Sequence, residues 1–324
     1  MEPVFPYPVL PAARLRLDGA VWIDETFPRD TIGEMDAETY DQRSRTFDLA
    51  RALDRKRPPF ADPLRALGKD AVILEVAAGR AAHSLALLQE GHRVIVSDVS
   101  QGSVRWAAEA AKRLGIDARG TFAVLDALHL PFPDASVDGV FLTASLHHFS
   151  SPLLAMCEFR RVLRAGGVLL VGYEPAKWSY RLFKPLWDSL KRVLRRHSPH
   201  AVSCADDATE GFTMADLRRL AWQAHFVEAR VEAVDFLEKL YEHAVVLVRK
   251  FLRLPDSEYR PGSRYLRQVD RFLARVPLLK RLAWNYDMSA RVPLPVHSSI
   301  PQLLSPFLST LPPSPSERGS TSRA

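Results

Sequence analysis

The chain has 324 residues, 47% of them hydrophobic and 25% charged, which is enough to bury a full core as one large domain or two small ones. No apolar run approaches the roughly 20 residues of a membrane-spanning helix, and no secretory signal opens the sequence, so we expect a cytoplasmic protein. The net charge of +6 is concentrated in residues 177–197 and 249–281, which leaves the rest of the chain acidic and excludes a surface that coats nucleic acid. Two cysteines, Cys157 and Cys204, provide neither a disulfide framework nor a metal cluster, so no metal is expected.

The two ends of the chain differ in composition from its middle. Residues 1–69 predict a loop-rich cap with one helix over residues 37–55, before the breaker "RPPFADP". Residues 294–324 are rich in proline and serine and predict a disordered tail. The core domain is therefore expected over residues 70–293, with helical insertions at 177–209 and 238–283.

From Asp70 onward, continuous apolar runs alternate with amphipathic helical patterns. The strands are predicted at 71–76, 92–99, 120–127, 137–146 and 167–173. A helical pattern that runs through Gln89 follows the first strand, and further helices are predicted at 103–115 and 152–164. Buried strands separated by helices indicate a parallel sheet covered on both faces. A capped helix over 213–226 precedes two later strands, 227–236 and 284–292, which suit an antiparallel edge. The predicted fold is α/β: a doubly wound, mostly parallel seven-stranded sheet with helical insertions.

The residues that follow each strand are the candidates for function, because ligands of open α/β sheets bind at the carboxyl ends of the strands. The small-residue turn "EVAAGRA" follows the first strand and lets a ligand approach the backbone closely. Asp98 ends the second strand, where a carboxylate can accept both hydroxyls of a ribose. Asp126 follows the third strand, where it can accept from an exocyclic amino group of a purine while the Ala127 amide meets a ring nitrogen. The competing interpretation is that these acids are ordinary surface residues at strand ends.

Four ordered segments resemble motifs of the class I S-adenosylmethionine-dependent methyltransferases, in their small-molecule, methyltransferase type 11-like branch. They are "VILEVAAGRAAHSLALL", "VIVSDVS", "DALHLPFPDASVDGVF" and "EFRRVLRAGGVLLVGYEP". The rival Rossmann interpretation, a dinucleotide dehydrogenase, lacks its G-x-G-x-x-G after the first strand. The resemblance implies that S-adenosylmethionine binds through Glu75, Ala77, Gly79, Asp98, Val99, Asp126, Ala127 and Tyr40, the last from the "YD" of the cap.

The glycine loop departs from the family pattern. Ala77 and Ala81 stand where the first and third glycines are usual, and Arg80 replaces a small residue, whereas the middle glycine, Gly79, is present. An alanine is excluded only from a backbone with positive φ, so a negative φ at Ala77 would make the exchange cheap. A catalytically inactive, methyltransferase-like binding or assembly protein is the alternative function.

Catalysis requires a positioned nucleophile and, for a hydroxyl acceptor, a base. His147 and His148 follow the fourth strand and are the candidate bases, while Tyr173, after the fifth strand, is a candidate pocket residue. The competing interpretation is that one histidine packs in the core and the other caps the helix that begins near Ser151.

The two basic insertions combine apolar stripes with arginines. The segment 177–197 is interpreted either as a lid helix with a solvated basic face or as an interfacial helix that contacts anionic lipid and admits an amphiphilic substrate. The residues 238–254 and 264–284 repeat this character. The two insertions together suggest a large, hydrophobic or acidic substrate, but they could equally form a dimer interface. We expect a small-molecule substrate of hydrophobic character, no nucleic-acid partner, and membrane contact that is at most peripheral.

Overall fold

The computed structural model describes residues 4–26, 59–79, 81–179, 181–182, 211–251, 263–276 and 279–295. Met1–Pro293 form one compact unit. Four expectations therefore lie outside the described residues: the helix over 37–55 with Tyr40, the position of Arg80, most of the insertion 177–209, and nearly all of the tail from 294.

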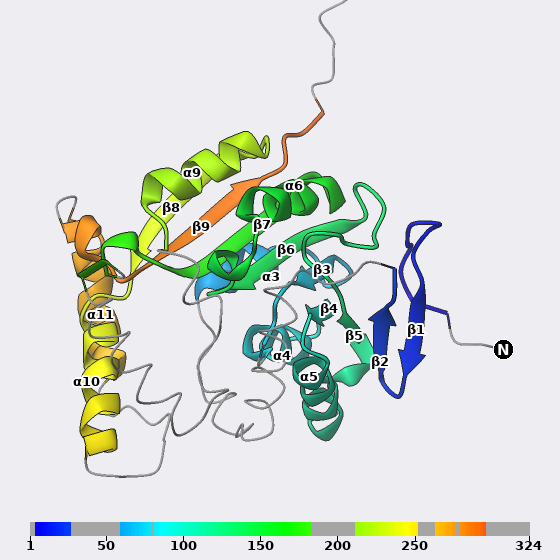
Figure 1. Ribbon diagram of the computed structural model, residues 1–324, viewed down its shortest axis with the longest axis horizontal. Coiled ribbons are helices and arrows are strands. Elements are labelled where there is room, and N and C mark those ends of the chain that lie inside the picture. Colours follow the sequence, from blue (N-terminus) through cyan, green and yellow to red (C-terminus); the bar gives the residue numbers. More distant parts are fainter. Residues whose placement is uncertain are drawn as a thin grey trace, which may run out of the picture. The chain divides into compact units, whose positions relative to one another are not determined.

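A nine-stranded sheet in the order β1-β2-β5-β4-β3-β6-β7-β9-β8 forms the centre of this unit (Figure 1). The strands from β2 to β7 along this order pair in parallel, and the pairs β1–β2, β7–β9 and β9–β8 are antiparallel. The strands are β1 (Leu15–Asp18), β2 (Val21–Asp24), β3 (Val72–Glu75), β4 (Arg93–Asp98), β5 (Gly120–Val124), β6 (Val137–Thr143), β7 (Leu163–Pro175), β8 (Val227–Val234) and β9 (Asn285–Arg291).

The sheet has nine strands rather than the predicted seven, because the cap contributes a hairpin. β1 and β2 are joined by Asp18-Gly19-Ala20, and Gly19 takes a φ of 67° in this turn. β2 then pairs with β5 through Trp22 and Ile23. The signal in the sequence was the alternating "LRLDGAVWID" around an Asp-Gly turn, and its four-residue strands are too short to stand out against the surrounding loop.

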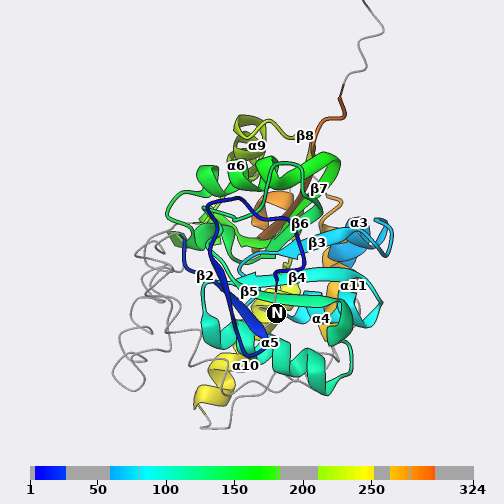
Figure 2. The ribbon, with the colours of Figure 1, turned by 90° about the vertical axis from the view of Figure 1, so that its right-hand side faces the viewer.

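Helices cover both faces of the sheet, as the continuous apolar strands predict. Figure 2 looks from the β1–β2 edge and shows α6 (Pro152–Val162) and α9 (Met214–Gln223) on one side, with α4 (Ala82–Gln89) and α5 (Gln101–Arg113) on the other. Alternate strand residues accordingly enter two separate apolar clusters: Leu74 and Leu142 pack toward α6 and α9, whereas Ile73 and Phe141 pack toward α4 and α5. The short α3 (Asp62–Arg65) and the 3-10 turn η1 (Pro59–Ala61) also lie on the second face.

The antiparallel edge confirms the prediction for the two late strands. β9 lies between β7 and β8, so the start of β9 and the end of β8 both reach the edge where β7 ends. Val234 pairs with Asn285, and Asn285 pairs in turn with Pro175. The helices α10 (Leu237–Phe251) and α11 (Ser263–Leu273) occupy the segment between these strands, so this insertion leaves and re-enters the sheet at its carboxyl edge. None of the helices in the described part of the chain is both long and apolar enough to cross a membrane.

Candidate active site

The order of the strands reverses between β3 and β6, because β4 and β5 lie on one side of β3 while β6 and β7 lie on the other. The loop after β3 meets both neighbours there. The Gly79 amide donates to the Asp98 carboxylate at 2.7 Å, and the Ser145 hydroxyl lies 3.3 Å from the Ala77 carbonyl oxygen. A topological switch point of this kind is where open α/β sheets bind their ligands.

The loop over residues 76–79 and 81 keeps the backbone angles of a glycine-rich turn without most of the glycines. Ala77, Gly79 and Ala81 have φ values of 51°, 49° and 48°. Ala78 donates its amide to the Ser97 carbonyl, and Ala81 to the Ala78 carbonyl, which fixes the turn to β4. The left-handed region costs a non-glycine residue about 1–2 kcal/mol, so both alanines are strained. Ala77 therefore does not adopt the negative φ that would have made the exchange of glycine for alanine free of strain.

Asp98 is buried at the end of β4, with 7% of its surface exposed. One carboxylate oxygen accepts from the Gly79 amide, and the other accepts from the Ser100 amide at 2.8 Å. Ser100 also caps α5 by accepting from the Ser103 amide. The backbone amides of Gly79 and Ser100 orient the Asp98 carboxylate at the end of β4. Val99, half-buried, follows directly on the chain.

Glu75 lies beneath the loop and is fully enclosed. Burial raises the pKa of its carboxyl to about 8, with the nearby Asp98 adding to the effect and Ser84 opposing it. The Oε2 atom of Glu75 is buried without a hydrogen-bond partner. An orphaned acceptor in this position suits a ligand that brings a donor, such as an ammonium group.

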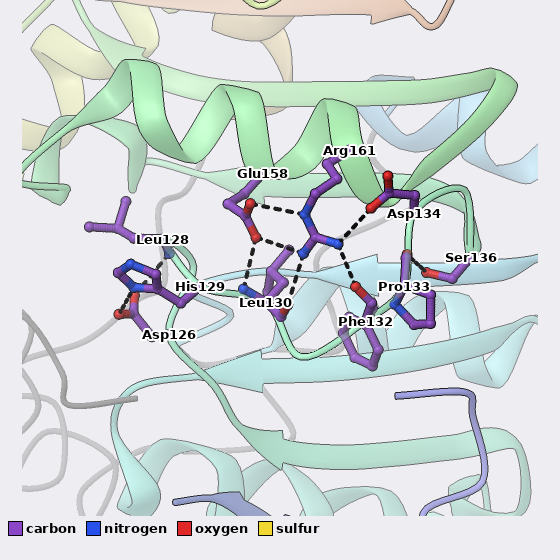
Figure 3. Close-up of polar contacts among 10 residues, drawn as sticks. All are labelled: Asp126, Leu128, His129, Leu130, Phe132, Pro133, Asp134, Ser136, Glu158 and Arg161. Carbon is purple, nitrogen blue, oxygen red and sulfur yellow. Dashed lines mark hydrogen bonds and ion pairs between the residues drawn. The ribbon is translucent and has the colours of Figure 1, made fainter. Parts of the chain in front are cut away.

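Asp126 is held in a loop that Arg161 organises from α6 (Figure 3). The Arg161 guanidinium donates to the carbonyl oxygens of Leu130 at 2.9 Å and Phe132 at 2.6 Å, and pairs with Asp134 and Glu158. Glu158 in turn accepts from the Leu130 amide at 3.1 Å. These contacts give the "EFRR" motif a physical role, because two of its side chains shape the loop that follows β5.

Asp126 itself closes the start of that loop. Its Oδ1 accepts from the Leu128 amide at 2.9 Å, and its Oδ2 lies 3.1 Å from Nδ1 of His129. The Leu125 amide donates to the Asp98 carbonyl oxygen at 3.2 Å, which ties the ends of β4 and β5 together. Ala127 is buried beside Asp126.

Glu174 anchors the histidine pair to the end of β7. Its Oε1 accepts from the amides of Ser145 and Leu146, both at 2.8 Å, and its Oε2 accepts from the amide of His147 at 3.2 Å and lies 2.9 Å from its Nδ1. Although full burial opposes ionisation, the His147 imidazole and the backbone amides lower the pKa of Glu174 below its usual range. The ionised carboxylate can only accept, so His147 must donate from Nδ1.

The two histidines have different surroundings. His147 is buried, and its ring lies 4.2 Å, between centroids, from the half-buried ring of His148. Ser151 caps α6 with its own hydroxyl, which accepts from the Leu154 amide. The cap of α6 is therefore Ser151 and not a histidine. His147 is buried, as expected for the histidine that packs in the core.

Tyr173 lies two residues before the end of β7 with a φ of 56°, and its amide donates to the Asp287 carboxylate of β9 at 2.7 Å. Its ring lies 5.9 Å from that of Phe60 and stacks at 6.3 Å on His83, the second residue of α4. Burial raises the pKa of Asp287 to about 7, and the nearby Asp235, Glu232 and Glu174 add to the effect. Tyr173 is thus fixed from two sides, by a carboxyl and by an aromatic pair.

The strand ends thus bring together Glu75, Ala77, Gly79, Asp98 and Ser145, and Glu174 joins His147 to this group. Sequence reasoning missed Arg161, His83 and Asp287 as supporting residues. Arg161 lies within a recognised motif and could have been found there. Asp287 meets Tyr173 across 114 residues of sequence, and no local pattern marks that contact.

The residues present fit S-adenosylmethionine. Open space surrounds the missing Cβ of Gly79, so the loop can approach a ligand there. Ala81 is the N-cap residue of α4 and provides no side-chain hydrogen bond to the first turn of the helix. The orphaned Glu75 oxygen and the two strand-end acids complete a set that matches an ammonium group, a ribose and a purine.

Comparisons with known proteins place the chain in a family. A family model described as a methyltransferase domain matches residues 74–171. Demethylmenaquinone methyltransferase of Thermobifida fusca is 33% identical over 147 residues, which are 44% of this chain and 61% of that enzyme. The enzyme of the same name from Parafrankia sp. is 31% identical over 197 residues, which are 53% of this chain and 75% of the relative.

A solved structure extends the likeness in fold. Phosphoethanolamine N-methyltransferase 2 of Haemonchus contortus, in complex with phosphomonomethylethanolamine and S-adenosylhomocysteine, superposes with a TM-score of 0.52 at 16% identity, over 84% of this chain and 63% of that one. The fold is that of a class I methyltransferase. The chain belongs to the S-adenosylmethionine-dependent methyltransferases. The Rossmann-like fold, the enzyme class and the cofactor predicted from the sequence are those of this family.

Proposed function

We propose that the protein transfers the methyl group of S-adenosylmethionine to a small hydrophobic metabolite, at an oxygen, carbon or nitrogen atom. The observation that carries the proposal is the loop after β3, which keeps left-handed angles at Ala77, Gly79 and Ala81 even where alanine makes them costly. A loop that had lost its ligand would be under no demand to keep this strain. The alternative of a silent binding protein offers no reason for it.

The cofactor supplies an electrophilic methyl group, and the residues of this chain hold and orient it. Asp98 would accept hydrogen bonds from the ribose hydroxyls. Asp126 and the Ala127 amide would bind the purine, and Glu75 with the first turn of α4 would bind the amino-acid end of the cofactor. Tyr40 and Val99 are the remaining candidates for contact. The family likeness supports all of these roles, and the contacts described above support those of Glu75, Asp98 and Asp126.

His147 is the proposed base for an acceptor that must lose a proton. Its Nδ1 donates to the ionised Glu174, so its Nε2 is the nitrogen that can take a proton. Glu174 is the positioning residue, because its three backbone contacts fix the ring on a rigid turn. His148 and Tyr173 are the further candidates to line the acceptor pocket.

The hydrophobic character of the acceptor is supported from two sides. The rings of Phe60 and His83 lie beside the ring of Tyr173. Relatives over the matched segment are named for demethylmenaquinone. A ring-bearing phenol or quinol is therefore the first acceptor class to test.

The test has a binding step and a transfer step. Titration with S-adenosylhomocysteine should give a calorimetric signal, and the absence of binding at high micromolar ligand would favour the silent alternative. For transfer, a panel of hydrophobic phenols is incubated with methyl-labelled cofactor, comparing His147→Asn with His148→Asn. We expect His147→Asn to lower kcat by about 10²–10⁴-fold while cofactor affinity is retained. Full activity in His147→Asn would exclude it as the base.

A further inference from the structure

Four apolar residues among the described side chains of helix α10 face outward. Leu237, Leu240, Ala244 and Val248 are exposed and follow one another at spacings of three and four residues, which places them on one face. Leu240 and Val248 expose 52% and 56% of their surface. Glu238 of the same helix is buried. A helix on the surface of a globular protein usually has the opposite arrangement.

The neighbouring helix α11 repeats the pattern. Tyr265, Val269 and Phe272 are exposed at spacings of four and three residues, and Phe272 exposes 64% of its surface. Asp270 is buried instead, and its carboxylate accepts from the amides of Phe236, Leu237 and Glu238 at 2.8–3.0 Å. An acid of α11 thus caps the start of α10 and locks the two helices side by side (Figure 1).

The exposed residues of both helices define what we call the α10–α11 apolar surface: Leu237, Leu240, Val248, Tyr265, Val269 and Phe272. Single exposed apolar residues need no explanation, but aligned stripes on two locked helices indicate an interaction site. The insertion leaves the sheet after Val234 and returns at Asn285, at the edge where β7 ends with Tyr173 and Glu174. The surface therefore belongs to an element rooted at the same edge as the proposed acceptor residues.

Charge decides which partner this surface fits. The two helices α10 and α11 together contain six lysines and arginines against three acids. An isologous dimer through this surface would bring two such basic segments together, which like-charge repulsion opposes. An anionic lipid leaflet attracts them instead, by about 1 kcal/mol for each Lys or Arg near its surface. Amphipathic helices rich in basic residues bury their apolar face among lipid headgroups in this way.

We propose that the α10–α11 apolar surface docks the protein onto anionic membranes. Docking places the carboxyl edge of the sheet near the bilayer, from which a hydrophobic acceptor can enter; this link to the acceptor rests on the proposed function, whereas the docking itself does not. Asp270 is the residue that keeps the two stripes aligned.

The experiment is co-sedimentation of the full chain with phosphatidylglycerol vesicles and, separately, with phosphatidylcholine vesicles. The test variant carries Leu240→Gln, Val248→Gln and Phe272→Gln, which replace exposed residues with a good helix former. The matched control carries Leu153→Gln, Leu154→Gln and Trp222→Gln, three exposed apolar residues of α6 and α9. We expect the unchanged protein and the control to sediment with anionic vesicles. The test variant should bind these vesicles at least about tenfold more weakly, and added salt should weaken the vesicle binding of all three proteins.

Two outcomes would overturn the proposal. One is that the unchanged protein sediments with neither kind of vesicle. The other is a concentration-dependent dimer, seen by analytical ultracentrifugation and lost in the test variant, without lipid binding; the surface would then fit a second copy. S-adenosylhomocysteine affinity, measured on every variant, reports whether each one folds and separates a failure of docking from a failure of the proposed enzyme.

Discussion

The amide of Gly79 donates to the carboxylate of Asp98 across 2.7 Å, and this bond joins the cofactor loop to the neighbouring strand. Asp98 therefore holds the turn in its left-handed form, in addition to its proposed role as an acceptor for ribose hydroxyls. The same carboxylate accepts from Ser100 at the start of α5. One side chain thus fixes two backbone segments of the site.

The first prediction concerns this dual role. Asp98→Ala should raise the Kd for S-adenosylhomocysteine by at least about 100-fold, because it removes a charged acceptor worth about 1.5–3 kcal/mol to each partner. Isothermal titration calorimetry measures the change. Asp98→Asn keeps one acceptor oxygen and should lose less affinity for the cofactor product. The control is Asp70→Ala, because Asp70 is an exposed acid before the opposite end of β3. Equal affinity in Asp98→Ala and the unchanged protein would show that the cofactor lies elsewhere.

The acids at the strand ends could be predicted because their signal is local. Each apolar run of a buried strand stops at a polar residue, and parallel strands bring those stops to one edge. The backbone angles at Ala77 and Ala81 could not be predicted in this way, since alanine gives no sign of a left-handed turn. The β1–β2 hairpin was missed because four-residue strands carry too few apolar positions to show a period.

The second prediction tests the strain at the alanines. Ala77→Gly and Ala81→Gly should each stabilise the protein by about 1 kcal/mol, since glycine adopts these angles without the steric cost of a Cβ. The expected rise in Tm is about 2–4 °C for each exchange. Ala86→Gly, inside α4, is the control and should destabilise by about 1 kcal/mol. A fall in Tm for Ala77→Gly would mean that the turn is not strained at that position.

The third prediction concerns the loop that carries Asp126. Arg161→Ala should weaken S-adenosylhomocysteine binding by about tenfold and lower stability by about 2–3 kcal/mol, because the carbonyl oxygens of Leu130 and Phe132 lose their donor. Arg164→Ala removes an arginine that pairs with Asp138 at the start of β6. This control should keep cofactor affinity unchanged. Loss of affinity in both variants would point to general destabilisation rather than to the Asp126 loop.

The supporting contacts resisted prediction for a different reason. Arg161 reaches across from α6 to the loop after β5, and Asp287 reaches from β9 to Tyr173, so both act between segments that are distant in sequence. Their residue types are ordinary for a helix surface and an edge strand. Only the pairing of the strands and the packing of the helix determine which backbone groups they meet.

The fourth prediction is a pH dependence of stability. The pKa of Asp287 is raised to about 7 and that of Glu75 to about 8, so both carboxyls favour the protonated form in the folded state. Their contribution is fully present below the pKa values of the unfolded chain and is lost as pH rises toward 7 and 8. The free energy of unfolding should therefore fall between about pH 5 and pH 8, by an amount on the order of a few kcal/mol. Glu174, with its lowered pKa, acts in the opposite direction and only under acidic conditions.

Asp287→Asn isolates one of these groups, because the asparagine oxygen can still accept from the Tyr173 amide but cannot ionise. We expect the variant to match the unchanged protein below about pH 4, where the Asp287 carboxyl is protonated in both the folded and the unfolded chain, and to exceed its stability at about pH 8, with a shallower profile between. Urea unfolding at a series of pH values measures the difference, and the agreement at low pH serves as the internal control. Parallel profiles for the two proteins would show that Asp287 does not titrate in this range, and the remaining slope would then be assigned to Glu75 and tested with Glu75→Gln.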